Sequence, residues 1–163
     1  MVPPIFKGRD SERPTGISLG TAAGWRVSGV RDPEVFFKAL PILAGVGSVL
    51  ALHDPQGRQV QRFLQQNPAT ESTPVEAGTI WPRCNIYHVE CSELNMKALE
   101  ELASCHVAPE IAVHAHLYRG RQVLLQWYDA FDGPMEISAA FSEEQIQKFC
   151  DACDGNYERV VVK

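Results

Sequence analysis

The sequence predicts an α/β domain with helices packed on a mixed β-sheet, and three observations carry this prediction. Apolar runs of strand length recur along the chain, as in GSVLALH at 47–53. Segments with apolar residues at helical spacing lie between most of these runs, as at 92–103. Helix-capping sequences that begin with Asp-Pro or Ser lie between the predicted strands and the helices that follow them. The predicted order is βαβα-βα-βββ-α-β with a C-terminal antiparallel meander, and an α+β arrangement of these elements is the alternative.

The first 24 residues differ in composition from the rest of the chain. They are rich in Gly, Pro, Ser and charged residues, so we expect an irregular or mobile N-terminal arm over 1–24. The remaining residues, 25–163, are enough for one globular domain with its own hydrophobic core.

Two strand–helix units are predicted in the first half of the domain. Residues 25–30 alternate as a strand, and Asp32-Pro33 then forms the start of a helix, because proline is well tolerated at the first helical position. The apolar run at 47–53 predicts a central strand that is covered on both faces. Asp54-Pro55 repeats the capping sequence before a second helix, and a long loop over 67–82 follows.

The second half contains a further strand–helix unit, a meander and a terminal helix and strand. We expect a strand at 86–91, a helix capped by Ser92, and a hairpin formed by 110–118 and 122–128. A third meander strand at 135–138 would follow, with the meander toward one edge of the sheet. A capping box at 142–145 and a final strand at 157–162 complete the order.

The hairpin also predicts its own register. A two-residue loop at Arg119-Gly120 would mix apolar and polar residues on both faces, whereas a three-residue loop or a bulge would keep one face apolar. Burying large apolar side chains stabilises a fold by about 1.5–3 kcal/mol each, which outweighs turn preferences of about 1 kcal/mol. The opposite face would then carry His114, His116, Gln126 and Tyr128.

Charge and cysteine content exclude some classes of protein. The formal net charge is −5; residues 1–83 have nine Lys/Arg and seven Asp/Glu (+2), and residues 84–163 have six and thirteen (−7). A basic footprint for nucleic acid is lacking, so we expect no nucleic-acid partner. No apolar run reaches the length of a membrane span or a secretory signal, so no membrane partner is expected. The five cysteines have no disulfide-scaffold spacing, which indicates a reducing, cytoplasmic location.

Several short motifs have a structural explanation. Cys150 and Cys153 would lie well inside a helix on its apolar stripe, so they are predicted to be core thiols. The 45–48 sequence, GVGS, precedes a strand and therefore lacks the helix N-terminus that holds phosphate. His106 is expected to bond the last carbonyls of the preceding helix.

The functional hypothesis is a non-catalytic, soluble protein-binding module, with an acidic inhibitor of immunity type for a basic partner protein as its specific form. No cofactor is expected. The candidate binding residues are polar or aromatic side chains of the hairpin face and of two loops, which anchor protein contacts elsewhere: His114, His116, Gln126, Tyr128, Asp129, Asp132 and Trp81.

Two alternatives remain open. His114 and His116 lie two residues apart on one strand face and could share a metal with His88, which would favour a metal-dependent hydrolase. A small-ligand-binding domain with a pocket between the meander and a helix is the other alternative. Asp129 and Asp132 fit turn chemistry as well as acid–base roles.

Overall fold

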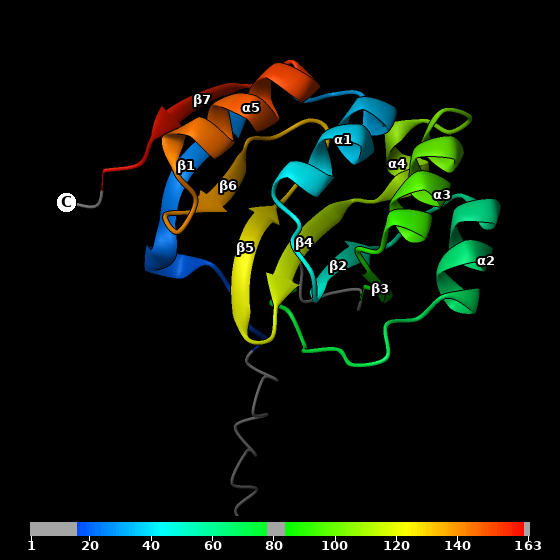
Figure 1. Cartoon of the computed structure of the whole chain (residues 1–163). Coiled ribbons are helices and arrows are strands. Elements are labelled where there is room, and N and C mark those ends of the chain that lie inside the picture. Colours follow the sequence, from blue (N-terminus) through cyan, green and yellow to red (C-terminus); the bar gives the residue numbers. More distant parts are fainter. Residues whose placement is uncertain (1–15, 78–83, 162–163) are drawn as a thin grey trace, which may run out of the picture.

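Seven strands form one sheet in the computed structural model, which describes residues 16–77 and 84–161 (Figure 1). The order across the sheet is β3-β2-β4-β5-β6-β1-β7. The strands are β1 (Ala23–Ser28), β2 (Ser48–His53), β3 (Ile86–Glu90), β4 (His114–Arg119), β5 (Gln122–Trp127), β6 (Met135–Ser138) and β7 (Asn156–Arg159). The helices are α1 (Pro33–Ala39), α2 (Arg58–Gln66), α3 (Glu93–Ala103), α4 (Ala108–Ile111) and α5 (Glu143–Cys153).

The predicted α/β class and the order of the elements are confirmed, but the expectation of a mixed sheet is wrong. Every pair of neighbouring strands in the described sheet is antiparallel. The connection from β2 to β3 contains both α2 and a long return segment, so β3 enters beside β2 in the opposite direction. The meander β4-β5-β6 lies in the middle of the sheet and not toward its edge, and β2 is second from one edge.

One face of the sheet carries the main hydrophobic core under a layer of helices, which Figure 1 shows gathered on that side. From β2, Leu50 and Leu52 point into this core. Trp127 of β5 lies at its centre, with ring centroids 5.1 Å from Phe36 and 4.6 Å from Phe131. Burial of such large apolar side chains is the main stabilising term of the fold.

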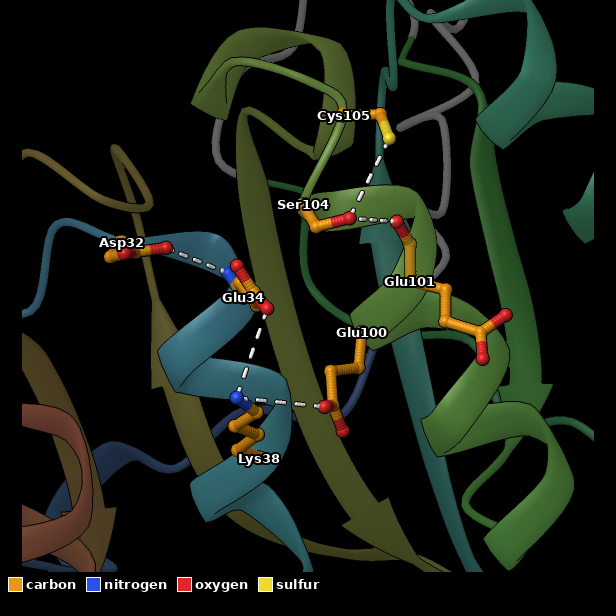
Figure 2. Close-up of polar contacts among 7 residues, drawn as sticks. All are labelled: Asp32, Glu34, Lys38, Glu100, Glu101, Ser104 and Cys105. Atoms are coloured by element: carbon orange, nitrogen blue, oxygen red, sulfur yellow. Dashed lines mark hydrogen bonds and ion pairs between the residues drawn. The ribbon is translucent and has the colours of Figure 1, made fainter.

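Two neighbouring helices of this layer are joined by polar contacts as well as by packing. Lys38 of α1 lies 3.7 Å from Glu34 of its own helix and 3.8 Å from Glu100 of α3 (Figure 2). The same view shows Asp32 at the start of α1, where its carboxylate accepts a hydrogen bond from the Glu34 N–H at 2.9 Å. These ion pairs are exposed, so each contributes little beyond orienting the helices.

Three of the predicted helix starts are confirmed, and one is wrong. Asp32, Ser92 and Ser142 accept backbone N–H groups in the first turns of α1, α3 and α5. Asp54 does not cap α2, which begins at Arg58 after Gly57. Its carboxylate instead accepts the Asn85 N–H at 2.8 Å, which ties the end of β2 to the start of β3.

Strands β4 and β5 of the hairpin are joined by a two-residue turn, and their pairing contains a bulge. Arg119 pairs with Gln122 across Gly120 and Arg121, so the three-residue loop is wrong and the alternative, a bulge, is confirmed. The register shifts between Leu117, opposite Leu125, and Tyr118, opposite Val123. Gly120 has φ 59°, a conformation that glycine adopts without strain.

The expectation that one face of the hairpin carries all its apolar residues is wrong, because these residues lie on both sides of the sheet. Leu117, Leu125 and Trp127 face the helices, whereas Val123 packs on the opposite face beside Tyr118. The first strand is also shorter than expected, because Ala108–Ile111 forms helix α4 with Pro109 at its start. Ile111 therefore enters the core from a helix, and Val113 is 36% exposed.

A second, smaller hydrophobic cluster lies on the face that the helices leave free. Its buried members come from 19–23, β2, the segment after α2 and the hairpin: Leu19, Ala23, Val49, Ala51, Val75, Tyr118 and Val123. A bridge between Ile17 and Val75 joins the two covering segments. Residues 16–24 and 69–77 therefore form a cover, and the sheet is enclosed on both faces here.

Candidate functional site

The hairpin histidines lie on the same face of the sheet as this second cluster, where they meet a third histidine from β2. His53 is directly opposite His114, and Ala51 is opposite His116, so all three rings emerge on one face of neighbouring strands. We name His53, His114 and His116 the histidine cluster. His53 and His116 have no solvent exposure, and His114 has 5%.

Hydrogen bonds within the cluster hold the rings in place. His53 Nε2 and His116 Nδ1 are 3.0 Å apart and form one hydrogen bond, and their rings stack with centroids 5.0 Å apart. His114 Nδ1 accepts the backbone N–H of Asp129 at 2.9 Å. The Tyr128 ring packs edge-on against His114 and His116.

Burial keeps the imidazoles of His53 and His116 neutral. It lowers the pKa of His53 to about 3 and that of His116 to about 4, and mutual repulsion between the histidines adds to both shifts. The Gln126 side chain opposes part of the shift at His116. Among the described residues, His53 Nδ1 and His116 Nε2 have no hydrogen-bond partner. His53 and His116 are therefore uncharged at neutral pH and closed to solvent.

The geometry does not support the alternative of a metal site formed by His114, His116 and His88. His88 Nδ1 lies 2.7 Å from the Tyr118 hydroxyl, so His88 pairs with a tyrosine of β4. His114 Nδ1 and His116 Nδ1 are occupied by the contacts described above. Within residues 16–77 and 84–161, no group of three or more His, Cys, Asp or Glu side chains is placed to hold a metal ion.

The structure brings some of the remaining candidate residues to this cluster and leaves others apart. Gln126 Oε1 accepts the Leu19 N–H at 3.1 Å, so it holds the cover. Asp129 belongs to a turn in which its carbonyl accepts the Gly133 N–H at 2.7 Å. Asp132 lies 3.4 Å from Arg31 on the exposed surface. Trp81 falls outside the described residues.

Other sequence predictions about reactive residues are confirmed. Cys150 and Cys153 are buried core thiols, and burial raises the pKa of these two thiols to about 11 and about 12. His106 Nδ1 donates to the Leu102 carbonyl at the end of α3, with 2.6 Å between the atoms.

A cavity of about 580 Å³ lies elsewhere, where β2 begins and β3 leads into α3. We name it the acidic cavity, because three of its lining residues are glutamates and none is Lys or Arg. The lining comes from the loop before β2, the segment after α2 and the β3–α3 junction: Ala44, Gly45, Val46, Gly47, Ser48, Val49, Thr70, Glu71, Glu90, Cys91, Ser92 and Glu93.

The glutamates come from three different elements. Glu71 follows α2, Glu90 ends β3, and Glu93 lies in the first turn of α3. Glu90 Oε1 accepts the Thr70 N–H at 3.1 Å, and this hydrogen bond lowers the pKa of the Glu90 carboxyl. No ion pair between described residues involves any of the three. The cavity therefore has a negative charge without a counter-charge in its lining.

A buried hydroxyl adds a polar group to the same lining. Ser48 is 2% exposed, and its Oγ has no hydrogen-bond partner among the described residues. Buried polar atoms without a partner are rare, because losing water without a replacement hydrogen bond is costly. The sequence signal for this place is the GVGS motif at 45–48, but the motif does not show that residues 71, 90 and 93 line the same cavity.

The comparisons with known proteins leave the function to be inferred from these residues. No protein family model matches the chain, and no curated protein or solved structure matches it either. In the described part of the chain, no helix has the length and apolar character needed to cross a bilayer.

Proposed function

We propose that this chain is a non-catalytic protein-binding module that captures a basic partner protein through its acidic cavity. An acidic inhibitor of immunity type is the specific form of this proposal. The observation that carries it is the cavity itself, with three glutamates and no lysine or arginine in its lining. Such a site attracts positive charge and rejects negatively charged surfaces.

Exposed apolar side chains next to the glutamates support a protein as the partner. Val46, in the cavity lining, is 100% exposed, and Leu94, which follows Glu93 in α3, is 84% exposed. Apolar contacts beside complementary charge are typical of protein interfaces. The acidic second half of the chain, with a balance of −7, would draw a basic partner from a distance.

The histidine cluster favours binding over hydrolysis. A metal-dependent hydrolase needs ligands that reach a metal and a substrate, whereas His53 and His116 are fully buried and bonded to each other. We assign the cluster to the packing of the sheet face and its cover.

A small-ligand-binding domain is the second candidate, because about 580 Å³ lies within the range of small-molecule sites. The lining differs from the pocket expected between the meander and a helix, since no meander residue contributes to it. A metabolite that raises the melting temperature of the wild-type protein, with no protein captured, would favour this candidate.

We also propose a cytoplasmic location. Cys150 and Cys153 are free thiols, and both are buried in the main core. Core thiols persist in a reducing compartment.

Affinity capture from a lysate of the source organism, with a matched control, tests the proposed function. The wild-type chain is compared with a cavity variant, Glu71→Gln/Glu90→Gln/Glu93→Gln, and a control variant, Glu101→Gln/Glu144→Gln/Glu158→Gln, whose glutamates are exposed and outside the cavity lining. Both variants lose three negative charges. We expect a basic protein to be retained by the wild type and the control, lost from the cavity variant, and released by salt.

Retention of the same protein by all three chains would refute the cavity as the docking site. Loss from both variants alike would show that net charge alone drives the association.

A further inference from the structure

We propose that His114 is a pH-sensitive clamp on the turn at 128–133, and that a proton taken up by this ring in acid releases the turn. The turn follows β5, leads toward β6, and includes the candidate binding residues Tyr128, Asp129 and Asp132. The inference goes beyond the proposed function and does not depend on it.

The contact between His114 and the turn fixes where the ring proton lies. The Asp129 N–H donates to His114 Nδ1 at 2.9 Å, so Nδ1 supplies a lone pair and has no proton. A neutral imidazole has one N–H, which must then be on Nε2. A second proton can bind only at Nδ1, where it would face the Asp129 N–H as one donor against another. The charged ring and this hydrogen bond therefore exclude each other.

The backbone of the turn is strained where the clamp holds it. Asp129 has φ 51° and Phe131 has φ 68°, so both lie in the left-handed region although neither is glycine. Aspartate tolerates this conformation, whereas a bulky phenylalanine rarely adopts it. Such residues keep their conformation only where surrounding contacts impose it. Loss of the contact at Asp129 therefore favours opening of the turn.

Other contacts of the turn involve backbone and apolar groups, which do not titrate. The Ala130 N–H donates to the Val113 carbonyl at 2.9 Å, next to the clamp. Phe131 is 5% exposed, and its ring centroid lies 4.6 Å from that of Trp127. These contacts limit the opening to a local one, so the sheet stays folded when the clamp is released.

Solvent reaches His114 more readily than it reaches the other members of the histidine cluster. His114 is 5% exposed, whereas His53 and His116 have no exposure. Protons from solvent therefore meet His114 first, and the buried pair remains closed.

Several titratable groups act on His114 or on the rings in contact with it. They are His53 of β2, His88 of β3, His116 of β4, Tyr128 and Asp129 of the turn, Glu76 of the cover and Glu136 of β6. Burial and the two glutamates raise the pKa of Tyr128 to about 12, so this ring does not change its charge in acid. The Asp129 carboxylate belongs to the clamped residue and could pair with a charged ring, so it needs its own control.

Nuclear magnetic resonance of the isotope-labelled full chain tests the clamp from about pH 8 to about pH 4, which spans the range of imidazole titration. At neutral pH we expect the His114 ring to be the Nε2–H tautomer, with a through-hydrogen-bond coupling between Asp129 N and His114 Nδ1. The coupling should vanish as His114 takes up a proton. The hydrogen-exchange protection of the Asp129 and Ala130 amides should fall about tenfold over the same pH interval. The amide peaks of Leu99 and Phe149 should keep their native positions, which shows that the domain is still folded.

Three substitutions separate the clamp from a merely structural role. His114→Asn offers an amide oxygen to the Asp129 N–H and does not titrate, so protection should be independent of pH. His114→Leu lacks an acceptor, and protection of Asp129 should be about tenfold lower than in the wild type at neutral pH. Asp129→Asn keeps the N–H and tolerates the left-handed conformation, so it should retain the wild-type response.

Four results would overturn the proposal. The first is a proton on His114 Nδ1 at neutral pH, and the second is a coupling that survives in the charged ring. The third is a response lost in Asp129→Asn or kept in His114→Asn, which would assign it to another group, such as the Asp132–Arg31 ion pair. The fourth is movement of the Leu99 and Phe149 peaks together with the His114 titration, which would make the event global unfolding.

Discussion

His53 and His116 show how the surroundings of a side chain decide its chemistry. In water an imidazole changes its charge near pH 6.5, yet here two rings are fully buried, stacked and joined by one hydrogen bond. The pKa of each is held far below the ordinary value, at about 3 and about 4. The energetic consequence is a fold that depends on these side chains remaining neutral.

The first prediction at this scale concerns pH. In the unfolded chain both histidines take up protons near pH 6.5. In the folded chain His116 stays neutral down to about pH 4 and His53 down to about pH 3. Between these limits the unfolded state binds more protons, so the free energy of unfolding falls as pH falls. We expect about 1.4 kcal/mol per pH unit for each histidine near pH 5, measured by urea unfolding.

The double variant His53→Leu/His116→Leu provides the control, since leucine fills a similar volume and does not titrate. This variant should lose most of the pH dependence of the free energy of unfolding between pH 4 and pH 6. A slope that persists in the variant would assign the acid sensitivity to other groups.

At the scale of elements, two Asp-Pro sequences that look alike perform different tasks. Asp32 caps α1 through the Glu34 N–H. Asp54 has φ 49° and binds the Asn85 N–H, so it joins two strands, and α2 starts later. The local sequence is compatible with both conformations. The neighbouring strand β3 supplies the partner that decides between them.

A substitution pair separates the two tasks. Asp32→Ala should cost about 1 kcal/mol of stability and speed hydrogen exchange at the Glu34 amide, because it removes a helix cap. Asp54→Ala should cost at least as much and speed exchange at the Asn85 amide, with α2 unaffected. Asp54→Asn, which keeps an acceptor and tolerates the left-handed conformation, is the matched control. Faster exchange in α2 on Asp54→Ala would contradict this assignment.

The hairpin makes the same point about register. The alternation of residues 114–118 and 122–127 predicts that polar and apolar side chains must be sorted between two faces. The chain does not sort them completely: a tight turn and a bulge near Leu124 place Val123 on the covered face and leave Leu125 and Trp127 on the helix side. The sequence predicts that the hairpin needs a bulge or an odd loop. The position of the bulge depends on the second hydrophobic cluster, in which Val123 packs.

At the scale of the whole molecule, the sheet has two unequal coverings. Helices enclose one face, and residues 16–24 and 69–77 enclose the other over the smaller cluster. Hydrogen bonds from the Leu19 N–H to Gln126 and from the Thr73 N–H to Tyr118 attach these segments. The bond to Gln126 attaches the cover beside His116, because Gln126 lies opposite His116 in the hairpin.

Weakening the cover should therefore be visible at the histidines. Leu19→Ala is expected to lower the free energy of unfolding by about 2–3 kcal/mol and to move the pKa of His116 upward toward 6.5, measured by NMR titration of the ring protons. Leu64→Ala, a change on the buried side of α2 in the main core, should cost stability without moving the pKa of His116. An unchanged His116 titration in Leu19→Ala would show that burial by the cover is not the cause of the shift.

The sequence by itself determined the class of the fold, the order of its elements, most helix starts and the burial of Cys150 and Cys153. These features follow from hydrophobic periodicity and capping, which are properties of short segments. It also placed His114 and His116 on one strand face.

The tertiary structure alone decided which strands are neighbours and in which direction they run. It brought His53 beside the hairpin histidines, paired His88 with Tyr118, and placed Glu71, Glu90 and Glu93 in the lining of one cavity. These residues are far apart along the chain, and their meeting depends on the free energy of packing the whole sheet. No local sequence pattern encodes this packing free energy. The histidine cluster and the acidic cavity can therefore be recognised only in the folded chain.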